Sequence, residues 1–401
     1  MNHRTQSFPR TIVLLVGLGL FLTACDEAEP GGAFEESTAL GDDAQSRSGH
    51  FPGGPPIRSC NLSYTPPSTF PPIDPVGLLG TEASECTAAT ANSPCAPHLV
   101  YAPAPTVERE PLVVFLPGTN MEPAQHVDML RTAASSGYRT IGLSYDNTTN
   151  PIDACGTELD CADDCLGKMR EEVVRGVTNI STNVEVDRGD SVVNRLYRVL
   201  EHLDTIDPNG GWADYYIPAT GNINAGDIVW ENIILSGFSQ GAATAAYISR
   251  AKSVHGLFLL DGAMLEVCDD GSEFVPASWL TTGVDASAGR PKYGVMHDQG
   301  LGLTNTPMSW DAMGLGSSLH DLDCAPGASC DVQDTLVPST ASKTSHAPPP
   351  GGCSEHESMA KDGCLPTDVA GTSAATTTDD ARLFRTYARR LCFACDSATC
   401  P

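Results

Sequence analysis

One serine stands where its hydroxyl could act as a nucleophile. The pentapeptide 237–241, Gly-Phe-Ser-Gln-Gly, follows a predicted strand that ends in Ile233-Ile-Leu235 and leads into a segment at 240–251 that contains five Ala. In a strand–turn–helix, such a motif lifts the serine side chain above the sheet, and the glycines avoid clashes with the adjoining strand and helix. The first amides of the helix point at the same place. The motif therefore predicts a nucleophilic Ser239 beside donors for a developing negative charge.

Alternating apolar runs and helical patterns surround this motif. The predicted strands are 112–116, 140–144, 228–235, 256–260 and 293–296, with a weaker one near Leu336. The predicted helices are 123–136, 191–203, 240–251 and 379–391. This alternation of strands and helices predicts an α/β fold: a doubly wound, mainly parallel sheet with helices on both faces. The pattern spans one domain, 111–401.

The motif in this setting resembles the nucleophile elbow of the α/β-hydrolase superfamily, whose esterases and lipases are serine hydrolases. The resemblance covers most of the chain from Leu112 onward. It implies a catalytic triad in the order nucleophile, acid, histidine. It also implies an oxyanion hole made by the amides of Gln240 and Thr119, the latter in the loop after the strand at 112–116. Chemistry of this kind needs no metal or cofactor, and we expect none.

A histidine after Ser239 must serve as the base in that order. The candidates are His255, His297, His320, His346 and His356. His356 is favoured because it lies in a loop between the last predicted strand and the final helix, which is where the family places this residue. His346, just before three consecutive prolines, remains the alternative.

The acid is expected on a loop directly after a strand. Asp298 fits best because it ends the predicted strand at 293–296. Asp261, one strand earlier, and Asp311 are the alternatives. With Ser239 and His356, Asp298 completes the predicted triad.

The composition restricts the partners and the compartment. The chain has 401 residues, a formal charge of −27 and 15 Cys. Nucleic-acid binding needs a basic surface, so no nucleic-acid partner is expected. Cysteines at this frequency indicate disulfides and an oxidising compartment.

The N-terminus predicts export and a membrane anchor. Residues 1–24 combine Arg with a short apolar run and are typical of a signal peptide. Leu22-Thr-Ala-Cys25 resembles the lipobox of bacterial lipoproteins, which implies a lipid on Cys25 and a location in the cell envelope, at the periplasm or cell surface. Residues 25–57, rich in Gly, Pro, Ser and acids, predict a flexible tether, and 58–110 a Pro- and Cys-rich wrap.

A Cys-rich, acidic insertion at 147–190 interrupts the domain, and the C-terminal tail is also rich in Cys. The insertion is long for a connection and could cover the site. Asp160, Asp163 and Asp164 could bind calcium, but they lack the EF-hand pattern, so disulfides with solvated acids are favoured. Zinc is disfavoured in an oxidising compartment. We therefore expect no metal site.

The expected activity is hydrolysis of carboxylic esters through an acyl-enzyme, on a small-molecule or lipid-like acyl substrate. Two alternatives stay open. The chain could be a non-catalytic, surface-binding lipoprotein on a hydrolase fold, or its serine could serve a peptidase or a polyester depolymerase. A fold alone does not choose among acyl substrates.

Overall fold

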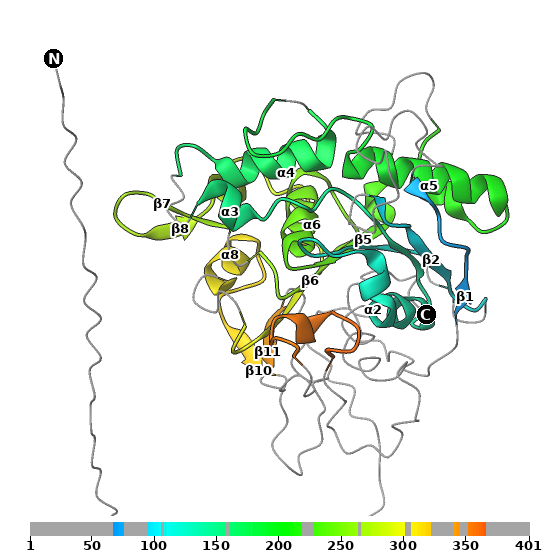
Figure 1. Cartoon of the computed structure of the whole chain (residues 1–401). Helices are drawn as coiled ribbons and strands as arrows, with labels where there is room; N and C mark the ends of the chain where they lie inside the picture. The colour runs from blue at the N-terminus through cyan, green and yellow to red at the C-terminus, as the bar shows by residue number, and fades with distance from the viewer. Residues whose placement is uncertain are drawn as a thin grey trace, which may run out of the picture. The chain divides into compact units, whose positions relative to one another are not determined.

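A computed structural model gives the fold of the chain (Figure 1). It describes residues 67–75, 95–105, 108, 110–156, 161–177, 179–218, 228–263, 266–300, 306–321, 340–344 and 352–365. The predictions for 1–57, including lipidation of Cys25, lie outside these residues. So do His346, the strand near Leu336 and the helix at 379–391.

The core is a mainly parallel sheet whose nine described strands follow the order β1-β2-β4-β3-β5-β6-β9-β11-β10. β1 and β2 pair antiparallel at one edge, β2 pairs antiparallel with β4, and the remaining neighbours are parallel. The strands are β1 (Ser68–Thr69), β2 (Leu99–Ala102), β3 (Leu112–Leu116), β4 (Arg139–Gly142), β5 (Ile233–Phe238), β6 (Gly256–Leu260), β9 (Lys292–His297), β10 (Leu319–Asp321) and β11 (Thr340–Thr344). The doubly wound α/β fold expected from the sequence is therefore confirmed.

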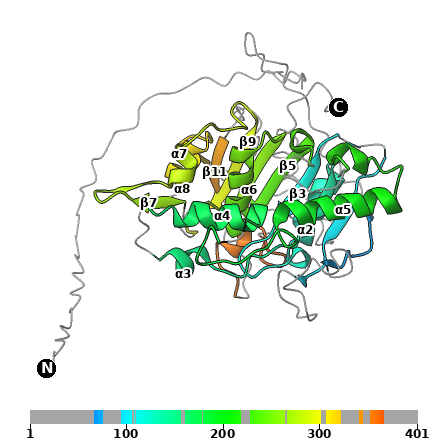
Figure 2. The same ribbon diagram turned by 90° about the horizontal axis from the view of Figure 1, so that it is seen from above.

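Helices cover both faces of this sheet (Figure 2). On one face, α4 (Cys165–Arg175), α5 (Val192–Ile206) and α6 (Gln240–Ala251) pack against alternate strand residues such as Val114 and Leu235. On the other, α2 (Val127–Ser135) packs against the intervening ones, such as Phe115. The central strands are buried on both sides, which explains why their sequences are apolar throughout.

Several predicted elements match the structure closely. β3 and α6 have the predicted bounds. β5 starts later than predicted because Trp230–Asn232 forms a 3-10 helix, η5. The helix predicted from 123 is divided: Pro123–Gln125 forms the 3-10 helix η3, and α2 follows.

The remaining described elements lie mostly at the periphery. They are α3 (Pro151–Cys155), α7 (Ser278–Thr281), α8 (Thr306–Ala312), the hairpin of β7 (Val267–Asp269) with β8 (Phe274–Pro276), and the 3-10 helices η4 (Trp212–Tyr215) and η7 (Glu357–Met359). In the part of the chain that the structure describes, no helix has the length and apolarity to span a membrane.

Disulfides close two short segments and link the insertion to the body. They join Cys155 to Cys165, Cys161 to Cys268 and Cys353 to Cys364. Cys95 is disulfide-bonded as well. These bonds agree with the preference for disulfides over a zinc site.

Candidate active site

Ser239 occupies the turn between β5 and α6, as the motif predicts. Its backbone has φ 54° and ψ −119°, a conformation that residues other than glycine rarely adopt. Its amide donates to Leu260 O at 3.0 Å. Gly241 allows this turn because a Cβ there would come within 2.0 Å of Leu116 O at the end of β3. The strained turn therefore depends on close packing of α6 against β3 and β6.

His356 and Asp261 form a buried pair, and Asp261 lies at the carboxyl end of β6, next to the strand that precedes Ser239. His356 Nδ1 lies 2.7 Å from Asp261 Oδ2, and the two side chains are 14% and 0% exposed. The His356 ring also packs on Phe238, with ring centroids 4.6 Å apart. Phe238 directly precedes Ser239, so the imidazole contacts the residue next to the candidate nucleophile.

Asp261 directly follows β6, with φ 37°. Burial raises the pKa of its carboxyl, while the hydrogen bond and the charge of His356 act in the opposite direction. A carboxylate in such a place favours a proton on Nδ1 of the histidine and stabilises the imidazolium ion.

Asp298, the acid expected from the sequence, is not paired with His356. It follows β9, and its Oδ1 lies 3.6 Å from Nδ1 of its neighbour His297. The structure thus places the sequence's alternative, Asp261, at the histidine. The reason is topological: β6 is the direct neighbour of β5, whereas β9 lies one strand further from Ser239. Asp311, the third candidate, is exposed on α8.

The other candidate histidines have different surroundings. His255 precedes β6, at the end of the strand away from Ser239, and its Nδ1 lies 3.2 Å from Glu231 O. His297 ends β9, and its Nδ1 accepts from the amide of Gln299 at 3.0 Å. His320 lies on the edge strand β10.

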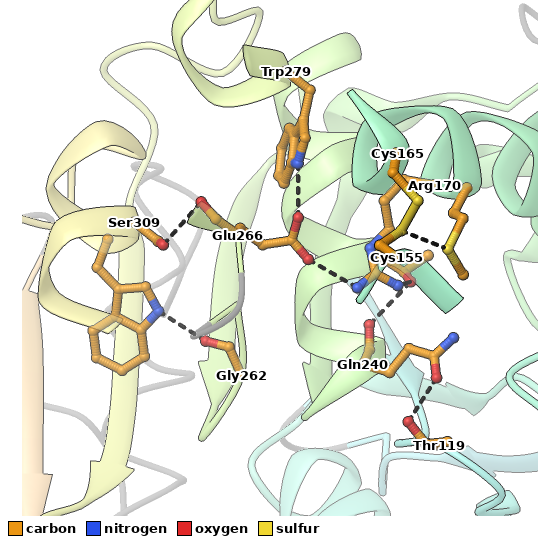
Figure 3. A network of polar contacts seen from close by, with 12 residues as sticks. Thr119, Cys155, Cys165, Arg170, Gln240, Gly262, Glu266, Trp279 and Ser309 are labelled. Atoms are coloured by element: carbon orange, nitrogen blue, oxygen red, sulfur yellow. Dashed lines mark hydrogen bonds and ion pairs between the residues drawn. A yellow bond between two sulfur atoms is a disulfide. The ribbon is translucent and has the colours of Figure 1, made fainter. Parts of the chain in front are cut away.

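The two predicted oxyanion donors come from adjacent segments. Gln240 is the first residue of α6, and Thr119 follows β3 in the loop 117–120, which we call the oxyanion loop. The Thr119 hydroxyl donates to Gln240 Oε1 at 2.6 Å (Figure 3). A Cβ on Gly118 would come within 3.2 Å of the Ser239 Cβ, so the oxyanion loop lies directly against the nucleophile.

Two residues that the sequence reasoning missed hold this loop. The Tyr145 hydroxyl donates to Pro117 O at 2.9 Å, and Asn147 Nδ2 donates to Gly118 O at 2.5 Å. The Asn147 carbonyl in turn accepts from the amide of Asn120 at 3.1 Å. Both residues follow β4. Their position just after a predicted strand was the only sequence feature that could have indicated a role near the site.

A buried ion pair supports α6 from behind the turn. Arg170 of α4 lies 2.8 Å from Glu266, with side chains 3% and 1% exposed, and Trp279 Nε1 donates to the same carboxylate at 2.7 Å (Figure 3). Arg170 also contacts the Thr244 hydroxyl at 3.3 Å, which donates to Gln240 O at 3.0 Å. Through Thr244 this network joins the insertion at 147–190 to α6, the helix that begins with Gln240, and the Cys161–Cys268 disulfide joins the insertion to β7.

The acidic residues of the insertion have local partners. Asp163 pairs with Lys168 at 3.0 Å, and Asp164 precedes α4, where the amide of Gly167 contacts its carboxylate. Asp160 lies outside the described residues. Within those residues, no group of three His, Cys, Asp or Glu is arranged to hold a metal ion.

Comparisons with known proteins give little guidance. No protein-family model matches this chain, and no curated protein matches it. Solved structures that resemble it include esterase 2 of Thermogutta terrifontis in its apo form, phosphorylated by paraoxon and phosphoramylated by tabun. Each has a TM-score of 0.30 and 12% identity, over 62% of this chain and 75% to 76% of the esterase chain. A likeness this weak supports no conclusion on function, which must be inferred from the chain's own geometry.

Proposed function

We propose that this chain is a serine hydrolase that cleaves carboxylic esters, with Ser239 as nucleophile, His356 as base and Asp261 as acid. One observation carries the proposal: His356 is held at 2.7 Å by the buried Asp261 and packs on Phe238, the residue before Ser239. Because Nδ1 donates to the carboxylate, Nε2 remains available for the serine hydroxyl. Asp261 takes the role for which the sequence favoured Asp298.

In the first half of the reaction, Ser239 Oγ attacks the ester carbonyl carbon while His356 Nε2 takes the hydroxyl proton. The carbonyl oxygen becomes negative and accepts hydrogen bonds from the amides of Gln240 and Thr119. His356 then gives its proton to the leaving alcohol as the carbon–oxygen bond breaks. Losing one such donor typically costs about 3–4 kcal/mol of transition-state stabilisation.

In the second half of the reaction, water hydrolyses the acyl-enzyme and releases the carboxylic acid product. His356 takes a proton from water, whose oxygen attacks the acyl carbon, and the proton passes to Ser239 Oγ as the acyl bond breaks. Asp261 stays ionised and stabilises the imidazolium ion in both halves. Its complete burial makes this electrostatic effect stronger than at a solvated site.

We further propose that the mature enzyme is anchored in the cell envelope by a lipid on Cys25. The described cysteines are all disulfide-bonded, which supports an oxidising, extracytoplasmic compartment. Replacing Cys25 with Ala should release the protein from the membrane fraction and abolish incorporation of labelled palmitate. A variant that still incorporates palmitate would contradict the anchor.

The activity is tested with a panel of substrates and one active-site variant. Short and long p-nitrophenyl esters, a peptide and an insoluble polyester are offered to the wild type and to Ser239→Ala. We expect hydrolysis of p-nitrophenyl esters by the wild type and its loss in the variant. Hydrolysis of the peptide or polyester alone would change the substrate class. A wild type inert towards all four substrates would favour a surface-binding lipoprotein.

A further inference from the structure

The segment at 353–365, which carries His356 and which we call the base loop, is attached to the start of α2 (Figure 1, orange). The Asp362 carboxylate accepts from the amides of Val127 at 2.7 Å and Asp128 at 3.0 Å. The Asp362 amide donates to Gln125 O at 2.8 Å. Three hydrogen bonds of one residue thus join segments that lie 235 positions apart in the chain.

α2 has no side-chain cap of its own. The residue before it, His126, makes no capping hydrogen bond with its side chain. The first amides of a helix have no partners within the helix, and a carboxylate is the acceptor that the helix dipole favours there. Asp362 supplies that acceptor from the base loop. His126 Nδ1 contacts Ala360 O of the base loop at 2.7 Å, so the attachment is reciprocal.

The base loop is otherwise held as one compact unit. The Cys353–Cys364 disulfide joins its two ends, and Met359 and Ala360 are buried in the apolar layer that includes α2. Where this unit sits against α2 therefore decides where His356 lies relative to Ser239.

The start of α2 is also the continuation of the oxyanion loop. Gly118 O accepts from the amide of Met121 at 3.0 Å, and the chain then passes through η3 into α2. The base loop and the oxyanion loop are therefore tied to the same short segment, 121–128.

We propose that Asp362 is a positioning residue for catalysis: by capping α2 it fixes His356 against Ser239 and the oxyanion loop. This inference rests on the proposed function. Asp362 does not touch the reacting atoms and acts through His356.

The test compares Asp362→Ala with the wild type in steady-state kinetics on a short p-nitrophenyl ester. A small displacement of a catalytic group can cost about 100-fold in rate, so we expect kcat to fall by about that factor. KM should change by no more than about twofold, because the interaction acts on the transition state. Asp362→Asn keeps an acceptor oxygen, so its kcat should be about tenfold higher than that of Asp362→Ala.

A matched control is available at the β7–β8 hairpin. Asp270 also accepts from two backbone amides, those of Ser272 at 2.9 Å and Glu273 at 3.1 Å, but these bonds are exposed and stay within the turn between β7 and β8. Asp270→Ala should leave kcat unchanged. Equal losses in both variants would overturn the assignment and indicate a general effect of removing a carboxylate that accepts from backbone amides.

A double-mutant cycle separates positioning from a merely structural role. If Asp362 acts through His356, Asp362→Ala should cause no further loss of the residual rate in a His356→Ala background. An additional loss as large as in the wild type would overturn the proposal. If Asp362→Ala fails to fold, judged by circular dichroism, the same cycle is run with Asp362→Asn.

Two further outcomes keep this inference apart from the proposed function. If His356→Ala abolishes the activity but Asp362→Ala retains it, the positioning role alone is refuted. Full activity in Ser239→Ala refutes the proposed function. In that case, amide exchange at Val127 and Asp128, expected to quicken in Asp362→Ala, still decides whether Asp362 docks the base loop, and unchanged exchange would overturn the docking.

Discussion

The turn at 237–241, which we call the elbow, and the base loop each carry one of the proposed catalytic side chains, Ser239 and His356, but they are supported by different forces. Ser239 sits between β5 and α6, and β5 pairs with β3 and β6 in the middle of the sheet. The base loop contains one 3-10 turn, η7, and is held by a disulfide, by Asp362 and by a small apolar contact. We therefore expect the elbow to share the stability of the core and the base loop to open at a lower free-energy cost.

This difference explains how strain can be stored at Ser239. A backbone conformation such as φ 54° costs on the order of 1–3 kcal/mol and persists only when its surroundings impose it. The buried strands and α6 provide those surroundings. His356 needs no strained backbone, since it is placed by contacts to its side chain and to its loop.

The largest expected effect concerns the base itself. Replacing His356 with Ala should lower kcat by about 10⁴-fold or more, because the serine loses its proton acceptor. His346→Ala is the control and should leave kcat within about twofold, as expected for a residue outside the triad. The reverse pattern would assign the base to His346.

The next effect tests the residue that joins the two regions. Asp261→Asn should lower kcat by about 10⁴-fold, because the neutral amide favours the wrong tautomer of His356 and no longer stabilises its cation. Asp298→Asn is isosteric and should lower kcat by less than about threefold. A larger loss in Asp298→Asn would restore the acid expected from the sequence.

A smaller effect comes from two disulfides of nearly equal span. Cys155–Cys165 and Cys353–Cys364 have sequence separations of 10 and 11, so removing either should cost a similar free energy of unfolding, about 3 kcal/mol. Only the double Cys→Ser variant at 353 and 364 should also lose kcat, by about tenfold, because only that bond lies in the base loop. Urea unfolding and kinetics on both variants provide the comparison. Equal kcat values would show that the base loop keeps its position without the bond.

The smallest effect is a dependence on pH at the contact between the base loop and α2. Burial lowers the pKa of His126 from 6.5 to about 4, opposed by its hydrogen bond to Ala360. Between these values the unfolded chain binds a proton that the folded chain does not, so stability is lost as the pH falls. At pH 5 the loss from His126 is about 2 kcal/mol.

His98 provides the matched comparison for this prediction. Burial and the charge of Arg195 lower its pKa to about 3, and its Nδ1 accepts from the amide of Ser144 at 3.0 Å, away from the base loop. His126→Gln and His98→Gln should both weaken the loss of stability in acid. In the wild type we expect amide exchange at 353–365 to become faster as the pH falls. Only His126→Gln should also remove this acid-induced rise. An unchanged stability slope between pH 7 and pH 5 in His126→Gln would contradict the assignment.

The two regions also differ in how far the sequence predicts them. The elbow is contiguous, so its motif, strand and helix are visible together, and α6 has the predicted bounds. The acid was harder to predict because an aspartate directly follows each of β6 and β9, and the pattern does not say which strand adjoins β5. His356 was predicted from its order in the chain and its place after the last predicted strand.

The contacts that hold the base loop left no local signal. Asp362 caps a helix 235 positions earlier, and Arg170 meets Glu266 across 96 positions. No sequence motif or spacing links the two residues of either pair, because tertiary packing alone brings them together. Asn147 was hidden similarly, because no pattern in the insertion signals its contact with Gly118.

The central claim is that Ser239 is activated by His356 and Asp261. The most direct measurement is mass-spectrometric mapping of a fluorophosphonate probe on the intact protein, with labelling rates for the wild type, Ser239→Ala and Asp261→Asn. The account predicts a single adduct on Ser239, none in Ser239→Ala, and labelling slowed by several orders of magnitude in Asp261→Asn. A wild type that never labels, or an adduct that persists in Ser239→Ala, would contradict it.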